Sequence, residues 1–393
     1  MAAISFFDQY LQRNCAFIHG HTRKALSACV HSVMGGASVS SSSIGRGLPG
    51  RSRTKSKIKR VDRLLGNGRL HDQLPDIYAA MAGSVLSARL RPVILVDWSS
   101  FEHGNQWALL RASVAVDGRS LTVLEHVHPI QQLNTSVAHE RFLDALATVI
   151  PAWARPIIVT DAGFLGPWFN AVRRHGWDFI GRLRGQTQVN LAGTDKWLTV
   201  NHFYTKASRR ARTLGRALCA KSAAYPAILH LVDETARANR ARLCATHTYN
   251  EPWLLVTSLD PQQYRSRQVV NLYAKRMQIE LTFRDLKDTR WSMALVNSRA
   301  SSAARREMLL LIATLATFML WLIGLAAETV QWHRHFQANT VKHKRVLSFV
   351  FLGREVYRNP DYHLDDAMLD QACQLMTYLL VNPDRTVGRA GGR

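Results

Sequence analysis

The strongest constraint on the fold is an apolar run late in the sequence. Residues 308–327 read MLLLIATLATFMLWLIGLAA, twenty residues without a charged side chain. A helix of this composition is stable either across a bilayer or buried on all sides in a large core. The run is solitary in an otherwise basic chain of 393 residues, long enough for two or three domains. We therefore predict a soluble protein, with no membrane segment, in which this run is a buried helix.

The composition is strongly basic, with 51 Lys and Arg against 28 Asp and Glu and a formal net charge of +23. Such an excess favours polyanionic partners, nucleic acid first and an anionic membrane surface as the alternative. The five cysteines are scattered without a CxxC pair, which argues against a disulfide framework or a zinc site and is typical of a reducing cytosol. The first residues, MAAISFFDQYLQR, lack the apolar core of a signal peptide. We therefore expect a cytoplasmic protein that acts on nucleic acid.

Residues 1–85 are helical in pattern and rich in basic side chains, which predicts an N-terminal helical DNA-binding domain. The Ser- and Gly-rich stretch 35–50 predicts a mobile loop. A basic run follows it, directly before the apolar Val61, Leu64 and Leu65. Such a run can be a solvated loop, but this position favours the start of a DNA-docking helix. Its basic residues are Arg51, Arg53, Lys55, Lys57, Lys59 and Arg60.

From residue 91 the pattern changes to buried strands. The runs RPVILVDW and RPIIVTDAGF each predict a short apolar strand that ends in an aspartate, Asp97 in the first and Asp161 in the second. The neighbouring segments predict a hairpin of residues 107–116 and 120–127, helices at 140–150 and about 165–175, and a strand at 177–183. Residues of about 185–260 hold strand-like pieces at 196–199, 228–232 and 253–259, interrupted by the basic stretch KASRRARTLGRALCAKS, and predict an inserted β-rich subdomain.

Residues 271–291, NLYAKRMQIELTFRDLKDTRW, contain no Pro or Gly and predict one unbroken helix. At 100° per residue, four polar groups fall within an arc of about 60°. These groups are Tyr273, Arg276, Glu280 and Lys287. The neighbouring arc is the expected core face, with Leu272, Ile279, Phe283 and Leu286. One carboxylate among spread-out phosphate-binding groups suits a DNA backbone lying across the helix, although a solvated charged edge gives the same pattern.

Asp97, Asp161 and Glu280 together indicate a metal site. Three carboxylates repel one another unless a divalent cation lies among them. Oxygen ligands suit Mg²⁺ or Mn²⁺, and two such ions about 4 Å apart can activate a water or a 3′-hydroxyl for in-line phosphoryl transfer. Each aspartate alone could simply cap a turn. The ordered pair followed by the striped helix favours the metal site.

The spacing Tyr273-x2-Arg276-x3-Glu280-x6-Lys287 is the YREK signature of the insertion-sequence-four family of bacterial transposases. The chain resembles that family over roughly residues 55 to 330. VDW with Asp97, TDAGF with Asp161 and PWLLVTS with Trp253 agree with it. The stretch KIKRVDRLLGNGRL is similar to the N-terminal DNA-binding segment of the insertion-sequence-ten transposases within the family.

The resemblance implies an α/β fold with a ribonuclease-H-like catalytic core over residues 86–330, interrupted by the β-rich insertion and preceded by the helical DNA-binding domain. It implies that Asp97, Asp161 and Glu280 hold two Mg²⁺ ions, for which Mn²⁺ can substitute. It further implies cut-and-paste transposition through a hairpin on the transposon end. The partners would be inverted-repeat end DNA, target DNA and a second copy in a homodimer, where each subunit cuts the end bound mainly by the other. The location would be the bacterial cytoplasm, associated with the nucleoid, and residues 331–393 would be a basic C-terminal region involved in dimerisation.

The resemblance also assigns DNA contacts. Tyr273, Arg276 and Lys287 would hold phosphates near the cleaved end. Trp253 would stack on a base that is flipped when the hairpin closes, since stacking on an indole offsets the unstacking, although a core aromatic is the alternative.

Other basic residues are weaker candidates. Arg182 and Arg184 follow the third core strand and are placed to touch phosphate near the metal site. A second group could contact DNA from the insertion or be solvated: Arg209, Arg210 and Arg212. The spacing of three histidines favours solvated or phosphate-facing side chains over a metal cluster: His333, His335 and His343.

Three other interpretations stay open. A metal-dependent nuclease or resolvase on the same fold would cut without joining and would not need the Tyr–Arg–Lys stripe or Trp253. A transposase-derived protein without catalysis would bind DNA and never cleave it, although all three carboxylates are present. A membrane protein anchored by residues 308–327 would not fractionate with soluble proteins.

Overall fold

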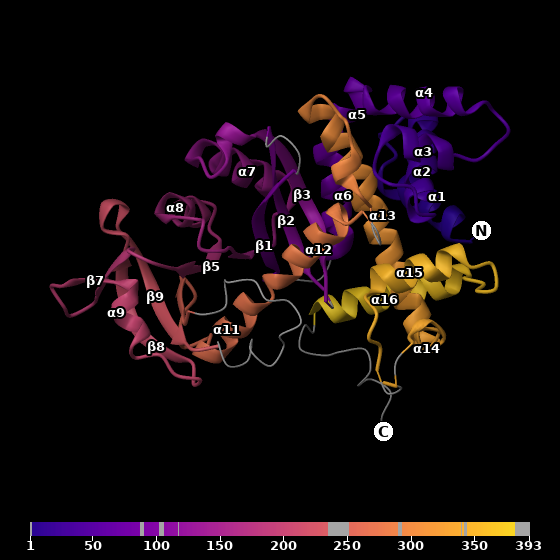
Figure 1. Ribbon diagram of the computed structural model, residues 1–393. Coiled ribbons are helices and arrows are strands. Elements are labelled where there is room, and N and C mark those ends of the chain that lie inside the picture. Colours follow the sequence, from indigo (N-terminus) through magenta and orange to yellow (C-terminus); the bar gives the residue numbers. More distant parts are fainter. Residues whose placement is uncertain are drawn as a thin grey trace.

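The computed structural model describes residues 2–86, 90–101, 106–116, 118–234, 251–289, 293–338, 340–341 and 344–381. Within them the chain forms one ten-stranded mixed sheet with the strand order β3-β2-β1-β4-β5-β10-β9-β8-β6-β7. Helices cover the sheet and form a second, all-helical part at one end of the molecule (Figure 1). The mixed α/β class is the one that the sequence predicts.

Five strands form the half of the sheet that carries the two aspartates. They are β1 (Val93–Ser100), β2 (Trp107–Ala115), β3 (Ser120–Pro129), β4 (Ile157–Val159) and β5 (Asp178–Leu183). β2 pairs antiparallel with β1 and β3, whereas β4 runs parallel to β1 and β5. The helices α7 (Ser136–Val149) and α8 (Gly166–Arg174) connect these strands. This arrangement is consistent with the ribonuclease-H-like core that the resemblance implies.

The strand boundaries differ slightly from the prediction. β1 continues three residues beyond Asp97 to Ser100, while β4 ends at Val159, two residues before Asp161. Helix α7 begins at Ser136, four residues earlier than expected, because the Thr135 side chain accepts a hydrogen bond from the backbone of Ala138 and caps the helix. The hairpin of β2 and β3 is confirmed, with its predicted turn residue Asp117 outside the described residues.

The strands from the predicted insertion extend the same sheet. They are β6 (Gln188–Leu191), β7 (Trp197–Thr199), β8 (Arg212–Cys219), β9 (Tyr225–Val232) and β10 (Trp253–Thr257), with the short helix α9 (Val200–Tyr204) after β7. β10 pairs antiparallel with β5, and β9, β8 and β6 follow in turn. The described strands therefore form one continuous sheet.

The strand β8 corrects the prediction that a basic stretch interrupts this region. Along residues 216–219 exposed and buried side chains alternate: Arg216 and Leu218 are exposed, and Ala217 and Cys219 are buried. That alternation is typical of a half-buried strand. The arginines at its start obscure the alternation in the sequence, because they lie on the exposed part of the strand.

The all-helical part begins with six helices: α1 (Ala2–Asn14), α2 (Gly20–Met34), α3 (Ser41–Gly47), α4 (Thr54–Leu65), α5 (Gly68–Asp72) and α6 (Leu74–Leu86). The prediction of a mobile loop at residues 35–50 is wrong, since α3 lies there with Ile44 fully buried. The glycines serve close packing: a Cβ added to Gly45 would lie 2.7 Å from the Ile58 Cα, and one added to Gly47 would lie 2.2 Å from the Ser32 Oγ. Glycine-rich sequence thus marks a tight helix contact here.

The apolar run is the core of helix α13 (Ala303–Thr329). By length and composition this helix could cross a membrane, but 94% of its most apolar window is buried inside the protein. It contacts α2 on one side and, on the other, α15 (Phe349–Arg358) and α16 (Asp366–Val381) of the C-terminal part, which also includes α14 (His333–Phe336). Figure 1 shows α13 between the N-terminal helices and the C-terminal helices. The prediction of a buried core helix is confirmed.

The predicted single helix of residues 271–291 is two helices, α11 (Ser266–Ala274) and α12 (Met277–Lys287). Between them Lys275 and Arg276 form a turn in which each backbone N–H donates to the carbonyl three residues earlier. All these residues are adequate helix formers, so the break is imposed by tertiary contacts of the turn. Of the predicted core face, Ile279, Phe283 and Leu286 are buried, whereas Leu272 is half-buried and the neighbouring Tyr273 is buried instead. Residue 291 lies outside the described residues.

Two glycines allow α13 and α15 to touch through their backbones. A Cβ added to Gly353 would lie 1.9 Å from the Leu320 carbonyl oxygen, and one added to Gly324 would lie 2.0 Å from that of Phe349. We expect Gly353→Ala to lower the free energy of unfolding by about 1–3 kcal/mol or more, because the helices must separate. Urea denaturation would measure it.

The control is Gly83→Ala in α6, where an added Cβ meets nothing within 4 Å. This variant should be neutral or more stable by about 0.5–1 kcal/mol, the intrinsic preference of a helix for alanine over glycine. Equal urea midpoints for the two variants would show that α15 can move away from α13 at no cost.

Candidate active site

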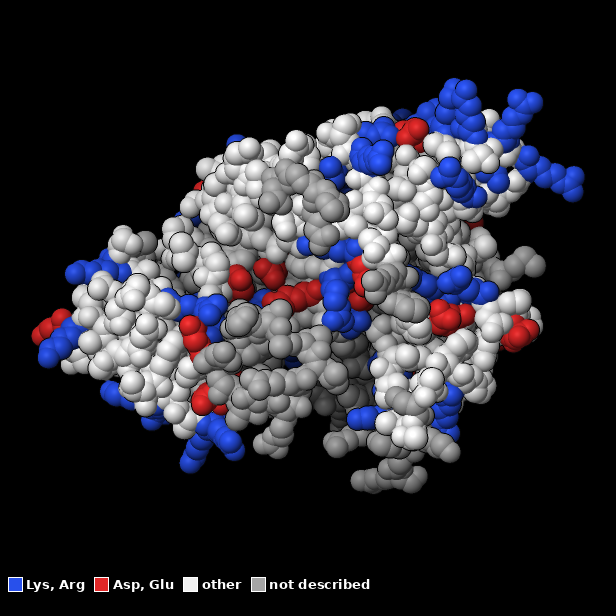
Figure 2. Space-filling model, in the orientation of Figure 1, with Lys and Arg blue, Asp and Glu red and all other residues white. Residues whose placement is uncertain are grey.

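The two aspartates lie at one edge of the sheet. Asp97 is on β1 and Asp161 follows β4, and these strands are parallel neighbours, so their carboxyl ends meet at the same edge. Glu280 is in the first turn of α12, which packs against β1, β2 and β3. Figure 2 shows Asp and Glu side chains gathered in the middle of this face, with Lys and Arg on both sides. The fold therefore brings together three residues that are up to 183 positions apart in the sequence.

The guanidinium of Arg276 lies between two of these carboxylates. Its Nη1 is 3.4 Å from Asp97 Oδ2 and 2.5 Å from Glu280 Oε1. Asp97 is buried, while the Glu280 side chain keeps 39% of its surface exposed. Asp161 is half-buried, and its Oδ1 accepts a hydrogen bond of 2.9 Å from the backbone N–H of Gly163. Arg276 thus supplies positive charge where the carboxylates converge.

The electrostatics of Asp97 confirm that the three carboxylates influence one another. Burial raises the pKa of Asp97 to about 7, and the negative charges of Asp161 and Glu280 contribute to the increase. Arg276 and the backbone N–H of Trp98 act in the opposite direction. Burial alone would lower the pKa of Arg276, but the acidic groups around it raise that pKa above its usual value. The site therefore concentrates negative charge that one guanidinium only partly offsets.

The donor chemistry of this site fits a hard divalent cation. The side chains of Asp97, Asp161 and Glu280 offer only oxygen, the ligand atom that Mg²⁺ and Mn²⁺ prefer. Burial is the main cause of the raised pKa of Asp97, and the charges of Asp161 and Glu280 add a like-charge repulsion that such a cation would relieve. In the described part of the chain, no three His, Cys, Asp or Glu side chains are close enough together to hold one metal ion.

An aromatic pair adjoins the carboxylates. The ring of Tyr273 lies 5.0 Å from that of Trp253 in an edge-to-face arrangement at 72°. Burial raises the pKa of the Tyr273 hydroxyl, while Arg276 and Arg182 lower it. Trp253 begins β10 and is half-buried, so part of its indole is open to solvent. Tyr273 thus lies between Trp253 and Arg276, because its ring is close to both the indole and the guanidinium.

Arg182 and Arg184 hold the segment that leads into Trp253. The Nη2 of Arg182 donates to the backbone carbonyls of Glu251 and Pro252, each at 3.3 Å. Arg184 Nε donates to the Glu251 carboxylate at 2.9 Å. Arg182 is buried, whereas the Arg184 side chain is 36% exposed and reachable from solvent.

The other predicted DNA contacts are spread over the molecule. Lys287 is the last residue of α12, half-buried and about 10 Å of helix rise from Glu280. Lys59 and Arg60 are exposed on α4, along which Lys and Arg side chains project in Figure 2. Lys57 is half-buried, and its Nζ donates to the Leu48 carbonyl at 2.7 Å. In Figure 1, α4 and α12 are well separated, so the N-terminal basic residues are not part of the carboxylate site.

The weaker candidates among the arginines and histidines lie away from the carboxylate site. Arg209, Arg210 and Arg212 are exposed at the start of β8. His335 is exposed, and its Nδ1 lies 3.1 Å from the hydroxyl of Tyr362. The prediction that His333 is solvated is wrong, because α14 packs it into the protein, and burial lowers its pKa. His343 lies outside the described residues.

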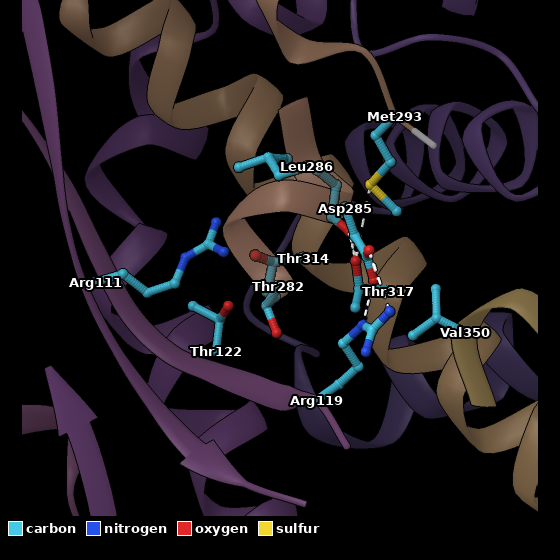
Figure 3. A pocket seen from close by; sticks show the side chains of 11 residues that line it. Arg111, Arg119, Thr122, Thr282, Asp285, Leu286, Met293, Thr314, Thr317 and Val350 are labelled. Carbon is cyan, nitrogen blue, oxygen red and sulfur yellow. Dashed lines mark hydrogen bonds and ion pairs between the residues drawn. The ribbon is translucent and has the colours of Figure 1, made fainter. Parts of the chain in front are cut away.

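Sequence reasoning missed the contacts that anchor α12. The Thr282 Oγ1 accepts a 3.0 Å hydrogen bond from the backbone N–H of Ser120 and lies 3.1 Å from the Ser120 Oγ. Arg119 forms an ion pair of 2.5 Å with Asp285. Figure 3 shows the side chains of Arg119, Thr282 and Asp285 around a cavity of about 20 Å³, room for about one water. The tip of the β2–β3 hairpin thus fixes the helix that carries Glu280.

A buried ion pair behind this anchor was also missed. Arg111 on β2 and Glu125 on β3 pair at 2.5 Å, with side chains 2% and 0% exposed. Tyr78 and Thr314 donate to the other carboxylate oxygen at 2.9 and 2.7 Å. The Arg111 guanidinium lies 5.0 Å from the centre of the Phe283 ring on α12. The sequence does contain an indication of this pair: each of two apolar strands of the predicted hairpin carries one charged residue, and the two residues lie opposite each other.

A family model described as the transposase DDE domain matches residues 88–317. No curated protein matches the sequence. Proteins of this family act on transposon DNA and generally use divalent metal ions, in agreement with the carboxylate site and the basic composition. Because the match covers more than half of the 393 residues, the chain belongs to the DDE transposases, enzymes that cleave DNA and transfer the cleaved strands.

Proposed function

We propose that this protein is a transposase of the insertion-sequence-four family that moves its element by cut-and-paste, with a hairpin formed at each transposon end. The observation that carries the proposal is the convergence of Asp97 and Glu280 on Arg276, next to the Tyr273–Trp253 pair. A nuclease that only cuts would need the carboxylates alone. Hairpin formation additionally requires an aromatic ring that stacks on the flipped base and a cation that binds phosphate. The Tyr273–Trp253 pair and Arg276 supply these two groups.

Asp97, Asp161 and Glu280 are the proposed ligands of two Mg²⁺ ions, with Mn²⁺ able to substitute. When bound, such ions supply Lewis-acid activation of a water or 3′-hydroxyl and stabilise the leaving oxygen. In the structure Arg276 is paired with Asp97 and Glu280. If divalent cations neutralised these carboxylates, the guanidinium would be available to bind a DNA phosphate. Tyr273 and Lys287 hold neighbouring phosphates. Arg184, exposed at the same edge, is a further phosphate contact.

Trp253 is the proposed stacking partner of a flipped terminal base. Its half-buried indole has one edge-to-face contact with Tyr273 and keeps exposed surface for a base. The hydrogen bonds from Arg182 to the carbonyls of Glu251 and Pro252 hold the preceding backbone in place. A fixed indole loses little entropy on stacking, which favours hairpin closure.

The domain roles extend this proposal. Residues 1–85 are the DNA-binding domain, with Lys59 and Arg60 exposed on α4 for end recognition, and residues 86–330 are the catalytic domain with its β-rich insertion of about 185–260. Residues 331–393 contribute to a homodimer that forms on inverted-repeat DNA and captures target DNA. The protein works in the bacterial cytoplasm, associated with the nucleoid.

The proposal is tested by incubating the purified protein with DNA that carries the element's own two ends, with and without Mg²⁺. We expect hairpin-ended and excised fragments only with the metal. Nicked products that never form hairpins or join to target would support a nuclease on the same fold. Binding without any cleavage in Mg²⁺ or Mn²⁺ would support a DNA-binding protein without catalysis and overturn the proposal.

We expect Trp253→Ala to nick the transposon end at nearly the normal rate and to form hairpins at least about tenfold more slowly, because stacking on an aromatic ring contributes about 1–3 kcal/mol per base. Gel analysis of both products over time measures the two steps separately. Trp153→Ala is the matched control, since Trp153 is 46% exposed and lies before β4. An equal loss of nicking and hairpin formation in Trp253→Ala would contradict the stacking role.

We expect Thr282→Val to lower the free energy of unfolding by about 1–3 kcal/mol, because the buried N–H of Ser120 loses its partner. Cleavage should fall more than end binding, because Glu280 loses its fixed position. Thr282→Ser keeps the hydroxyl and should retain most of both properties. Urea denaturation and single-turnover cleavage measure the two effects. Normal cleavage by the valine variant would show that the hairpin does not position α12.

A further inference from the structure

A second cavity lies beyond the C-terminal end of α12. Its volume is about 620 Å³, within the range of ligand sites in proteins. Three segments that are distant in the sequence enclose it: the β2–β3 turn at Arg119, the end of α12, and residues 345–354, which include the start of α15. Its charged lining consists of Arg119, Arg284, Arg345, Arg354, Asp285 and Asp288.

Positive charge dominates this lining. Arg119 is neutralised by its ion pair with Asp285, and Arg345 Nε lies 3.1 Å from Glu328 outside the cavity. Arg284 is exposed and has no hydrogen-bond or ion-pair partner for its side chain among the described residues. Arg354 is 8% exposed; burial, with Arg358 nearby, lowers its pKa, and Asp285 and Glu355 act in the opposite direction. The lining holds four arginines against two aspartates, and an anion in the cavity would balance this excess of positive charge.

The helix α15 adds to the positive electrostatic potential in the cavity. It begins at Phe349 after its capping residue Ser348, and both Ser348 and Phe351 line the cavity. The positive end of the helix dipole therefore opens on the same space as the arginines. The arginines and this helix end come from three segments of the fold: the β2–β3 turn, α12 and residues 345–354.

The cavity lies on the same helix as the proposed active site. Arg284 follows Glu280 by one turn, about 6 Å of helix rise, and Asp288 follows by two. One strand of duplex DNA advances about 3.4 Å along its axis per nucleotide, so this interval corresponds to about two nucleotides. In Figure 2, Lys and Arg side chains lie between the acidic group and the region of α15. A DNA strand that runs along α12 from a scissile phosphate at Glu280 would therefore pass the mouth of the cavity.

We propose that this cavity binds a backbone phosphate of the transposon DNA about two nucleotides from the scissile phosphate, held by Arg284 and Arg354 with the aid of Arg345. The C-terminal part of the chain then contacts the DNA directly, next to the catalytic helix. This inference rests on the proposed function, because it takes the position of the DNA from Glu280.

The test measures binding in a Glu280→Gln background, so that no DNA is cut. The probes are duplexes of the element's end, including a set in which one phosphate at a time is replaced by a neutral methylphosphonate. Arg284→Gln removes one cavity charge with little change in helix propensity. Arg354→Lys keeps the charge and removes the planar fork. The control is Arg155→Gln, an exposed arginine before β4 at the opposite edge of the sheet.

We expect Arg284→Gln to reduce the slope of log K against log salt by about 0.9, the value for one lost phosphate contact, and Arg155→Gln to leave it unchanged. One methylphosphonate about two nucleotides from the cleavage site should weaken the parent protein and have a much smaller effect on Arg284→Gln and Arg354→Lys. Equal slopes and equal methylphosphonate profiles for all variants would overturn the proposal.

A third measurement distinguishes a site for a DNA phosphate from a site for a free anion. If inorganic pyrophosphate raises the melting temperature of the parent and not of Arg284→Gln, while the DNA profiles stay identical, the cavity is a free-anion site and the DNA proposal is overturned. Loss of all specific end binding by the parent protein would instead contradict the proposed function itself.

Discussion

Glu280→Gln is expected to reduce strand cleavage at least about a thousandfold while binding to transposon-end DNA is retained. Loss of one anionic ligand removes several kcal/mol of transition-state charge stabilisation, and about 1.4 kcal/mol corresponds to a factor of ten. The Glu280 side chain is 39% exposed at the start of α12, and it forms an ion pair with Arg276. Its replacement by the isosteric amide therefore leaves the fold intact. Single-turnover cleavage in Mg²⁺ and an end-binding titration measure the two properties.

The loss cannot come from protonation of the neighbouring aspartate. Glu280 contributes to the raised pKa of Asp97, so neutralising Glu280 lowers that pKa and favours the ionised form of Asp97. The matched control is Glu140→Gln, which also breaks an ion pair with an arginine, Arg174, on an exposed helix surface. It should leave cleavage unchanged. A Glu280→Gln variant that loses end binding to the same extent as cleavage would make this residue structural.

Arg111→Met is expected to lower the free energy of unfolding by about 3–5 kcal/mol, the largest stability effect that we predict. Both side chains of the Arg111–Glu125 pair are almost fully inaccessible to solvent. Removing the guanidinium leaves a buried carboxylate with hydrogen bonds from Tyr78 and Thr314 and no compensating charge. The pair links β2 and β3 with α6 and α13, so its loss acts on the whole core. Urea denaturation at constant pH measures the change.

The double variant Arg111→Met/Glu125→Leu separates charge from packing. Replacing a buried ion pair by apolar residues of similar volume is often close to neutral, so the double variant should recover part of the stability. Recovery stays incomplete, because the hydroxyls of Tyr78 and Thr314 lose their acceptor. If the double variant is as unstable as Arg111→Met, the destabilisation comes from lost packing against Phe283 and not from the unpaired charge.

Several features of the site follow from local sequence pattern. A run of apolar residues before Asp97 and another before Asp161 predicted two buried strands, because a short continuous apolar run is typical of a strand buried on both faces. The spacing from Glu280 to Lys287 predicted two side chains on one helix, α12, because helix geometry is regular, whereas Tyr273 lies on α11. The family match over residues 88–317 agrees with the function that this spacing indicates.

Other features depend on contacts between distant segments. The break at Lys275 and Arg276 occurs among good helix formers, and it lies where Tyr273 packs on Trp253 and Arg276 reaches Asp97. The serine- and glycine-rich stretch around Ile44 was predicted to be mobile, because composition cannot distinguish a flexible glycine from one that lets Ile58 approach. β8 was missed because its strand partner, and not its own arginine-rich sequence, makes it a strand.

Local sequence patterns thus predicted the family signature, the strands that carry Asp97 and Asp161, and the buried helix α13, since each depends on residues close together in the chain. The position of Arg276 between two carboxylates, the anchoring of Thr282 by the hairpin tip and the cavity lined by four arginines arise only when the chain folds. These features bring together residues up to 235 positions apart, from Arg119 to Arg354. Their geometry depends on the packing of whole elements, which no local pattern of residues encodes.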